Sequence, residues 1–580
     1  MIELFETTDD HDRRLALTAT GLLRTFNEAG VLTAADVHVA RRVGALGGES
    51  DERVLLALAL ATRAVRHGSV CLDLATVADV AAELPWPTYD PWVSSIAGSP
   101  LVTAGVLRWE YDLLYLDRYW HQEVQVCADL LSRLESPPQV VNQAVLDAGV
   151  SRVFGGPSYA EQRAASLQAA TQWTTVLTGG PGTGKTTTVA GLLALLAQQA
   201  SLSGHTLRIA LTAPTGKAAA RLQEAVSAVL LPPEDRDRLG SLQATTMHRL
   251  LGSRRDNGTR FRHHRANRLP HDVIVVDETS MVSLTMMTRL VEAVRPDARL
   301  ILVGDPDQLA SVEAGAVLAD IVSGLAGVSP SPVVALQTTH RFGEQIGRLA
   351  TALRLGDADE VMNALRAGGP EVEFVESEDP APLLRAEILQ AALAVQAHAE
   401  AGDPAGAVAA LSRHRLLCAH REGPYGVSHW NRQVEHWLTE ATGDPLYDQM
   451  YVGRPLLVTA NDYGLGIYNG DSGVVVRQDD GMLRAAIGGT DGLLDFATSR
   501  MSDVDTMHAM TIHKSQGSQA GHVTVLLPPE DSRLLTRELF YTAVTRAKQT
   551  VRVVGTESSV RAAVERRAQR ASGLRQRLGG

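Results

Sequence analysis

The chain has 580 residues, with 45% hydrophobic and 21% charged residues. This is the composition of an ordinary folded protein and excludes a disordered or fibrous chain. The length exceeds what one hydrophobic core usually supports, so we expect three or four domains. The formal net charge of -12 argues against nucleic-acid binding over the whole surface, so any such site must be a local groove.

Cysteine usage and the amino terminus favour a cytoplasmic protein. Cys71, Cys127 and Cys418 are far apart and lack metal-ligand spacing. A sparse, odd set of this kind is typical of a reducing compartment. The acidic amino-terminal segment differs from a signal peptide. No apolar run approaches the roughly 20 residues that span a bilayer, so we expect no membrane partner.

Residues 1–125 are predicted to form a mostly helical N-terminal domain with a hairpin at residues 107–116. Eight Trp and Tyr side chains fall between residues 86 and 120, although only 4% of the chain is aromatic. They indicate either a compact aromatic core or a docking face for another protein, because interfaces are rich in Tyr and Trp. The next segment, residues 126–158, contains a Ser-Pro-Pro run and is expected to be a linker.

A phosphate-binding loop is the strongest motif. Its residues match the pattern G-x-x-x-x-G-K-[ST], between a short apolar strand pattern and a helical pattern: Gly179, Gly180, Pro181, Gly182, Thr183, Gly184, Lys185, Thr186 and Thr187. Glycines let backbone N–H groups surround phosphate oxygens, and the helix amino terminus favours the anion. Lys185 would bind the β- and γ-phosphates, and the Thr186 hydroxyl would ligate Mg²⁺. The sequence therefore predicts ATP and Mg²⁺ as ligands.

Further residues complete the predicted nucleotide site. A buried-strand pattern ends at Asp277 and Glu278, which are suited to hold Mg²⁺ through water and to deprotonate the attacking water. Another strand pattern leads into Gln308, placed to sense the γ-phosphate. Arg341 and Arg546 are candidates to contact that phosphate, a role worth about 10³–10⁵ in rate.

Three stretches suggest contact with a polynucleotide. Thr215 and Gly216 follow a strand pattern and would hold a phosphodiester backbone or simply form a strand–helix turn. Residues 251–271 predict a basic hairpin inserted between strands, which is either a wedge for nucleic acid or a solvated loop. Residues 450–505 predict a small β insertion, in which Asn461 faces DNA or serves a turn.

The arginine-rich carboxyl tail is expected to be a solvated, frayed helix.

The order of these motifs resembles that of superfamily 1 helicases of the 5′→3′ branch. The motifs lie at residues 179–186, 212–216, 277–278, 304–308, 340–341, 511–517 and 541–546. Within that branch the chain is similar to the RecD family, the alpha subunits of the RecBCD helicase–nuclease (exodeoxyribonuclease V). The motor motifs cover residues 160–550, and Arg118–Trp120 resembles the end of the family's N-terminal domain, which docks on RecC.

The resemblance implies an α/β fold with two RecA-like parallel-sheet motor domains, residues 159–345 and 346–580, beside the helical N-terminal domain. The β insertion would be SH3-like. Gln162 would bind adenine. The resemblance assigns DNA contacts to Thr215, His248, Thr511 and His513. Gln519 departs from the family, where Glu is frequent, which puts in doubt only a contact at the domain boundary.

The same resemblance implies an ATP-dependent 5′→3′ DNA helicase with DNA-stimulated ATPase activity and no nuclease site of its own. It would act on single-stranded DNA and duplex ends in double-strand-break repair and recombination, in a heterotrimer with RecB-like and RecC-like subunits. Two alternatives remain open. One is a stand-alone 5′→3′ helicase, and the other is a nucleotide-gated scaffold that clamps DNA without unwinding it.

Overall fold

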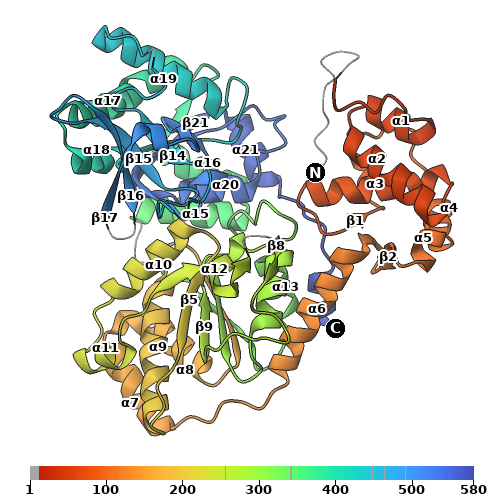
Figure 1. The fold of residues 1–580 in the computed structure, drawn as a ribbon, viewed down its shortest axis with the longest axis horizontal. Coiled ribbons are helices and arrows are strands. Elements are labelled where there is room, and N and C mark those ends of the chain that lie inside the picture. The colour runs from red at the N-terminus through yellow and green to blue at the C-terminus, as the bar shows by residue number, and fades with distance from the viewer. Residues whose placement is uncertain (1–11, 255–256, 340–342, 447, 463, 490–491) are drawn as a thin grey trace.

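Two parallel sheets covered by helices dominate the structure, and a smaller helical domain stands to one side (Figure 1). The structure is a computed structural model, which describes residues 12–254, 257–339, 343–446, 448–462, 464–489 and 492–580. No helix within those ranges is long and apolar enough to cross a membrane. This α/β architecture agrees with the fold class expected from the sequence.

In the described part of the N-terminal domain, α3 and α5 pack against a three-stranded sheet of order β1-β3-β2, and α1, α2 and α4 pack on α3. The expected hairpin at residues 107–116 is confirmed, since β2 and β3 pair antiparallel. The aromatic cluster serves both as core and as surface: Trp92 and Tyr115 are buried, whereas Tyr89 and Tyr111 are exposed. The elements are α1 (Gly21–Glu28), α2 (Ala34–Gly47), α3 (Glu52–Arg66), β1 (Leu72–Asp73), α4 (Tyr89–Ala97), α5 (Pro100–Thr103), β2 (Leu107–Glu110), β3 (Leu113–Leu116) and the connecting α6 (Asp117–Leu134).

The first sheet domain has six parallel strands in the order β11-β4-β10-β9-β5-β6. Its inner strands β4, β10, β9 and β5 are largely buried, as expected where helices cover both faces of a parallel sheet, whereas the edge strands β6 and β11 are partly exposed. Its elements are α7 (Gln143–Val153), α8 (Ala160–Ala170), β4 (Thr174–Gly179), α9 (Lys185–Ser201), β5 (Ile209–Ala213), α10 (Gly216–Ala228), α11 (Pro233–Leu239), β6 (Ala244–Thr246), α12 (Met247–Leu251), the hairpin β7 (Ser253–Arg254) and β8 (Asn257–Phe261), β9 (Val273–Val276), α13 (Leu284–Ala293), β10 (Arg299–Gly304), α14 (Val317–Gly324) and β11 (Val333–Leu336).

Residues 126–158 differ from the linker expected there. They include the second half of α6 and all of α7, and Leu146, Val150 and Phe154 are buried in the core against α9. The Ser-Pro-Pro run occupies only the short connection between the two helices. The turn-forming residues before position 143 therefore do not prevent a helix at 143–153. Burial of its apolar face, formed by Leu146, Val150 and Phe154, stabilises that helix.

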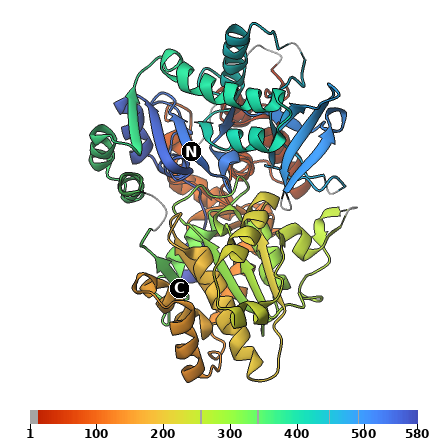
Figure 2. The ribbon, with the colours of Figure 1, turned by 90° about the vertical axis from the view of Figure 1, so that its left-hand side faces the viewer.

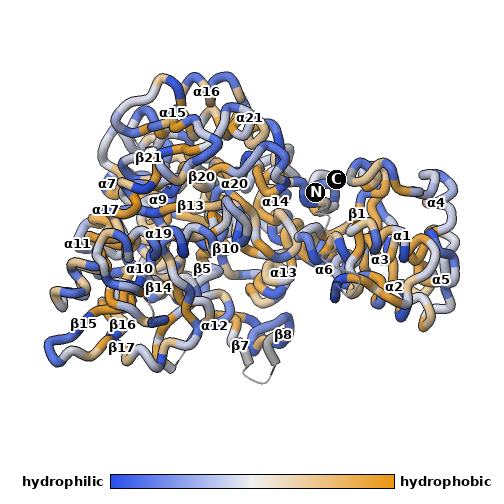
Figure 3. Tube along the Cα trace, turned by 90° about the horizontal axis from the view of Figure 1, so that it is seen from above, coloured by the Kyte–Doolittle hydropathy of each residue, from blue (hydrophilic) through white to orange (hydrophobic). Residues whose placement is uncertain are grey.

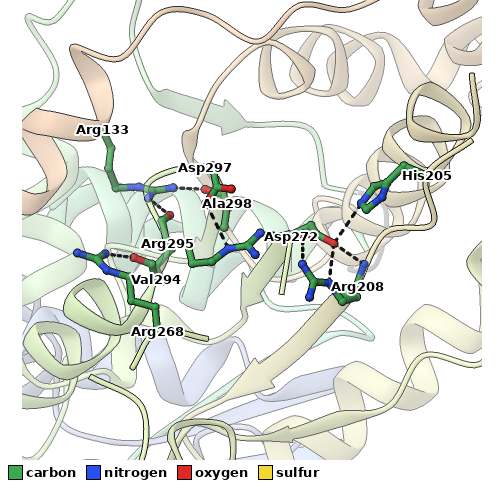
Figure 4. Close-up of polar contacts among 9 residues, drawn as sticks. All are labelled: Arg133, His205, Arg208, Arg268, Asp272, Val294, Arg295, Asp297 and Ala298. Carbon is green, nitrogen blue, oxygen red and sulfur yellow. Dashed lines mark hydrogen bonds and ion pairs between the residues drawn. The ribbon is translucent and has the colours of Figure 1, made fainter. Parts of the chain in front are cut away.

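Arg133 fixes the end of α6 to the first sheet domain. Its guanidinium donates to Thr174 Oγ1 at 2.9 Å. It also donates to the carbonyl of Arg295 at 2.9 Å and to that of Ala298 (Figure 4), so its partners here are all neutral oxygens. Burial lowers the pKa of Arg133 to about 10. Close by, Asp272 accepts from Arg208 and Arg295, which ties together the amino ends of neighbouring strands.

The second sheet domain has five parallel strands in the order β12-β21-β20-β13-β19. A separate five-stranded antiparallel sheet, of order β17-β16-β15-β14-β18, is inserted between α19 and β19. The elements are α15 (Glu344–Leu355), α16 (Ala358–Ala367), β12 (Val372–Glu376), α17 (Ala381–Glu400), α18 (Pro404–Leu411), β13 (His414–Cys418), α19 (Val427–Thr442), β14 (Pro455–Val458), β15 (Ser472–Arg477), β16 (Leu483–Gly489), β17 (Gly492–Ala497), β18 (Val504–Thr506), β19 (Ala509–Thr511), β20 (Ala520–Leu526), α20 (Arg537–Val544), β21 (Ala547–Gly555), α21 (Glu557–Glu565) and α22 (Leu574–Gly579).

The β7–β8 hairpin and the inserted antiparallel sheet project from the same side of the molecule (Figures 2 and 3). The insertion also contacts the first sheet domain directly. Lys217 Nζ donates to the carbonyl of Gly470 at 3.1 Å, and a Cβ at Gly216 would lie 2.5 Å from Tyr468 Cβ. A glycine is therefore required at the start of α10 for this close approach.

The expectation of a solvated carboxyl tail is wrong. The chain leaves the second sheet domain after α21 and returns to α6, where its end lies (Figure 1). Arg577 forms ion pairs with Glu110 at 2.6 Å and with the buried Glu123 at 3.3 Å. Leu574 and Leu578 are buried in the core cluster of the first sheet domain. The arginine content suggested exposure, but Arg566, Arg570 and Arg577 meet carbonyls and carboxylates on distant parts of the chain.

This packing predicts the effect of trimming the tail side chain Leu574. Leu574→Ala should destabilise the protein by about 2–5 kcal/mol, because it leaves a cavity in a closed core. Leu230→Ala, at a position that is 91% exposed, is the matched control and should change stability little. Urea unfolding followed by tryptophan fluorescence measures both. Equal midpoints for the two variants would contradict the packed tail.

Candidate nucleotide site

The phosphate-loop residues form a tight turn between β4 and α9. Gly182 and Gly184 both have a φ of 86°, in the left-handed region that glycine adopts without steric cost. The Thr183 hydroxyl donates to the carbonyl of Gly180 at 2.9 Å and closes the turn. Thr186 and Thr187 occupy the first turn of α9, where backbone N–H groups and the helix dipole favour an anion.

Two side chains are held against this loop. Lys185 Nζ donates to the carbonyl of Gly179 at 2.6 Å and to that of Gly180 at 2.9 Å. Gln162, on α8, donates from Nε2 to the carbonyl of Thr183 at 3.1 Å. Gln162 is 1% exposed, and its Oε1 has no hydrogen-bond partner in the described structure. A buried amide oxygen without a partner is costly, so it is suited to accept from a ligand.

Asp277 and Glu278 directly follow β9, beside the phosphate loop. Burial and the adjacent Glu278 carboxylate raise the pKa of Asp277 to about 6, while Lys185 opposes the shift. Glu278 has a φ of 50°, which a non-glycine residue rarely adopts. Backbone strain of this kind is concentrated at functional sites. The turn lets two consecutive carboxylates line one cavity, whereas on a strand they would point to opposite faces.

Hydrogen bonds join the two sheet domains at the end of β10. Asp305 Oδ2 accepts from Gln308 Nε2 at 3.0 Å and from the Tyr541 hydroxyl at 3.0 Å. Gln308 Oε1 in turn accepts from the Arg546 guanidinium at 3.1 Å. Tyr541 and Arg546 belong to the second domain, on α20 and just after it. Burial raises the pKa of Asp305, and its hydrogen-bond donors oppose that shift.

A cavity of about 740 Å³ opens between the two domains at this point, within the usual size range of small-molecule sites. Residues of both domains line it, and so does Gln519, the residue at which this chain departs from the family pattern. The predicted residues that it brings together are Gln162, Pro181, Gly182, Gly184, Lys185, Thr186, Thr187, Asp277, Glu278, Gln308 and Arg546. We call this cavity the nucleotide cleft. Arg341 lies outside the described residues.

The residues expected to contact DNA occupy two places. Thr215 caps α10 by accepting from Ala218 N at 3.2 Å, and Gly216 packs on Tyr468 of the insertion. The segment after β19 approaches the same helix, because a Cβ at Gly517 would lie 3.8 Å from that of Ala218.

The remaining expected contacts comprise two side chains in local hydrogen bonds, one half-buried histidine and one distant position. Asn461 Oδ1 accepts from Asn469 N at 2.9 Å, and Thr511 Oγ1 accepts from Lys514 N at 3.2 Å, so both support turns. Burial lowers the pKa of His513, which follows β19. His248 is separate, in a cavity of about 500 Å³ that residues of the N-terminal domain also line.

Sequence reasoning assigned no role to Asp305 and Tyr541. Asp305 lies three residues before Gln308, in a polar loop directly after a buried strand. That position could have marked it in the sequence as a residue of the nucleotide site. Tyr541 lies on a helix whose residues are otherwise mostly apolar and buried, so its pattern resembles an ordinary core position. Only the closed arrangement of the two domains places its hydroxyl on Asp305.

Three family models match the chain. They are an AAA domain over residues 162–314, a UvrD-like helicase C-terminal domain over residues 506–554, and the N-terminal domain of RecBCD enzyme subunit RecD over residues 28–113. The first of these contains the phosphate loop, Asp277 and Gln308. The second contains Arg546.

Comparison with whole proteins finds similarity along the full chain. RecBCD enzyme subunit RecD of Mycolicibacterium smegmatis is 62% identical, over 96% of this chain and 99% of the relative. The ATP-dependent RecD2 DNA helicase of Deinococcus radiodurans is 30% identical, over 83% of this chain and 60% of the relative. Among solved structures, the Pif1 helicase from Candida albicans aligns with 69% of this chain and 96% of its own, at 16% identity and a TM-score of 0.39.

The loop geometry predicts different consequences for two glycines. An alanine at a left-handed position costs about 1–2 kcal/mol, so Gly184→Ala and Gly204→Ala should both lose stability. Only the Cβ at Gly184 meets the site, 3.0 Å from Gln162 Nε2, whereas the Cβ at Gly204 enters open space. Gly184→Ala should therefore displace Gln162 and weaken binding of a fluorescent ATP analogue several-fold, since one neutral hydrogen bond contributes about 0.5–1.5 kcal/mol. Equal affinities in the two variants would argue against the site.

Proposed function

The chain belongs to the RecD family, and from this premise we propose that it is an ATP-dependent 5′→3′ DNA helicase, the motor subunit of a RecBCD-type helicase–nuclease. Its two parallel-sheet domains, residues 159–345 and 346–580, act as the two lobes of the motor. ATP is hydrolysed in the nucleotide cleft between them, and the resulting domain movement carries single-stranded DNA across the molecule. The work belongs to double-strand-break repair and recombination.

One observation carries this proposal: Gln308 of the first domain accepts a hydrogen bond from Arg546 of the second, at 3.1 Å, beside the phosphate loop. A group from each lobe thus meets where the terminal phosphate would lie. Loss of that phosphate would remove a negative charge that both groups contact. Binding and hydrolysis therefore change the free energy of domain closure, which is what a nucleotide-driven motor needs.

The cleft residues suit a magnesium nucleotide. Asp277 and the Thr186 hydroxyl supply oxygen ligands, which Mg²⁺ prefers. When bound, Mg²⁺ would neutralise the charge that develops on the transferred phosphoryl group. Lys185, which the loop carbonyls now hold, would turn to the β- and γ-phosphates. The unpartnered Oε1 of Gln162 would accept from the amino group of adenine.

Glu278 is suited to orient and deprotonate the attacking water. It adjoins Asp277 on a turn that faces the cleft, and its backbone strain fixes the direction of its side chain. Arg546 would stabilise the charge on the γ-phosphate in the transition state, and Gln308 would report the presence of that phosphate to the second domain. Arg341 is proposed to reach the same phosphate.

The proposed DNA track runs over α10 and the inserted sheet. The contacts of Gly216 and Lys217 with residues 468–470 place elements of both domains next to each other there. Thr215, Asn461, Thr511 and His513 are the proposed backbone contacts. His248, at the base of the β7–β8 hairpin, is a further candidate, and the hairpin is the proposed wedge at a duplex end.

We propose RecB-like and RecC-like subunits as partners, in a cytoplasmic complex that supplies the nuclease. The relative from Mycolicibacterium smegmatis is named as a RecBCD enzyme subunit and is similar over nearly its whole length, which supports this assembly. Tyr89 and Tyr111, exposed on the N-terminal domain, suit it as the docking domain.

Two substitutions separate binding from hydrolysis. Lys185→Gln should abolish DNA-stimulated ATPase activity, because the phosphates lose their cation. Glu278→Gln should still bind ATP, but its kcat should fall by about 10²–10⁴, the usual contribution of a general base. Steady-state ATPase assays with and without single-stranded DNA measure both. DNA-stimulated hydrolysis that persists in Lys185→Gln would refute the proposed site.

A strand-displacement assay tests the helicase itself. With ATP and Mg²⁺, the protein should separate a duplex that carries a 5′ single-stranded tail and leave a 3′-tailed duplex intact. Run with and without co-expressed RecB-like and RecC-like chains, the assay distinguishes a complex subunit from a stand-alone helicase. If the protein binds DNA and turns over ATP but separates no strands, both with and without the co-expressed chains, it would instead be a clamping scaffold.

A further inference from the structure

We propose that Tyr541 is a positioning residue for ATP hydrolysis: its hydroxyl holds Asp305, and through Asp305 it sets Gln308 against Arg546. The proposal rests on the ATPase function proposed above. In this proposal a residue of the second domain orients Asp305 and Gln308 of the first domain before phosphoryl transfer.

The Tyr541 hydroxyl contacts the first domain inside a buried interface. It donates to Asp305 Oδ2 at 3.0 Å, and the two residues are only 4% and 2% exposed. A hydrogen bond to a buried carboxylate is among the stronger polar contacts in proteins. Tyr541 therefore recognises the charge of Asp305 specifically, and does more than fill space in the interface.

Asp305 divides its oxygens among three donors. Oδ2 accepts from Tyr541 and from Gln308 Nε2, and Oδ1 accepts from the backbone N of Asp307 at 3.1 Å. Since Asp305 holds the amide nitrogen of Gln308, the amide oxygen is turned outward to Arg546. A change in the orientation of Asp305 would therefore rotate Gln308 away from that guanidinium.

Hydrogen bonds join the four side chains in series, from Tyr541 through Asp305 and Gln308 to Arg546, and the backbone between Tyr541 and Arg546 completes a ring across the cleft. Asp305 and Gln308 come from one loop of the first domain, while Tyr541 and Arg546 come from one helix end of the second. Two adjacent contacts support the ring: Leu309 N donates to Thr542 Oγ1 at 2.9 Å, and Gln516 donates to the Leu309 carbonyl at 2.7 Å. The ring can close only when the two domains approach.

Tyr541 also adjoins the phosphate loop. A Cβ on Gly180 would lie 3.1 Å from the Tyr541 hydroxyl oxygen. The same loop residue accepts from Lys185 through its carbonyl. The hydroxyl thus lies beside the phosphate loop and also holds the carboxylate that orients Gln308. Movement of the loop on nucleotide binding would therefore act on Tyr541 and, through it, on Asp305.

Tyr541→Phe removes the hydroxyl and keeps the ring of the side chain. We expect the DNA-stimulated kcat to fall about tenfold, the factor for one hydrogen bond to a charged group. The KM for ATP should stay within about twofold, because Lys185, Thr186 and the loop backbone still bind the nucleotide and uniform binding is preserved.

Tyr451→Phe is the matched control. Tyr451 is also a largely buried tyrosine that donates to a carboxylate, Glu435 Oε1 at 3.2 Å, but it lies outside the nucleotide cleft. It should lower thermal stability about as much as Tyr541→Phe and leave kcat unchanged. If both variants lose stability and neither loses kcat, Tyr541 is a structural residue and the proposal is overturned.

A double variant tests whether Tyr541 acts through Asp305. Once Asp305→Ala has removed the carboxylate, adding Tyr541→Phe should reduce kcat no further, because coupled residues are non-additive. Multiplicative losses would overturn the proposed route. If the wild-type protein shows no DNA-stimulated ATPase activity, the function proposed above fails instead, so the two failures are distinguishable.

Discussion

The hydrogen bond between Gln308 and Arg546 is the contact on which the arrangement of the two sheet domains depends. Polar groups buried at an interface are costly unless each finds a partner. Asp305, Gln308 and Arg546 are all nearly inaccessible to solvent, so the polar groups at the base of the cleft are buried. In such surroundings hydrogen bonds are strong and a missing partner is penalised heavily. Two domains with separate cores are therefore coupled through a few side chains at the mouth of the phosphate loop.

The connecting helix α6 and the carboxyl tail both strengthen the first sheet domain. Arg133 fastens α6 to the amino ends of its strands, and the tail returns from the second domain to pair Arg577 with Glu123 on the same helix. The tail therefore connects the domains a second time, through noncovalent contacts with α6 and the first core, besides the direct chain connection that follows β11. A movement between the domains has to be accommodated by the chain between α21 and α22, because the core contacts of Leu574 hold the tail's end in place.

The acidic net charge and the proposed DNA binding are compatible because the proposed contacts are local. The insertion, α10 and the segment after β19 adjoin one another, and they derive from both domains. A strand that contacted all of them would sense any change in the distance between the domains. The proposed nucleotide and DNA sites are thus connected through α10, whose residues Ala218 and Arg221 also line the nucleotide cleft.

The sequence by itself determined the features that depend on neighbouring residues. The phosphate loop needs glycines at fixed spacing before Lys185, and Asp277 with Glu278 follows a short apolar strand, so both patterns are local and could be recognised. The alternation of residues 107–116 likewise determined a hairpin. Tertiary structure alone decided the contact between Tyr541 and Asp305, which are 236 residues apart, and the return of the tail to Glu123. Sequence patterns indicate burial and turns only over a few neighbouring residues. The contacts of Tyr541 with Asp305 and of the tail with Glu123 form only when separate cores pack together, because a buried charge then needs a hydrogen-bond or ion-pair partner nearby.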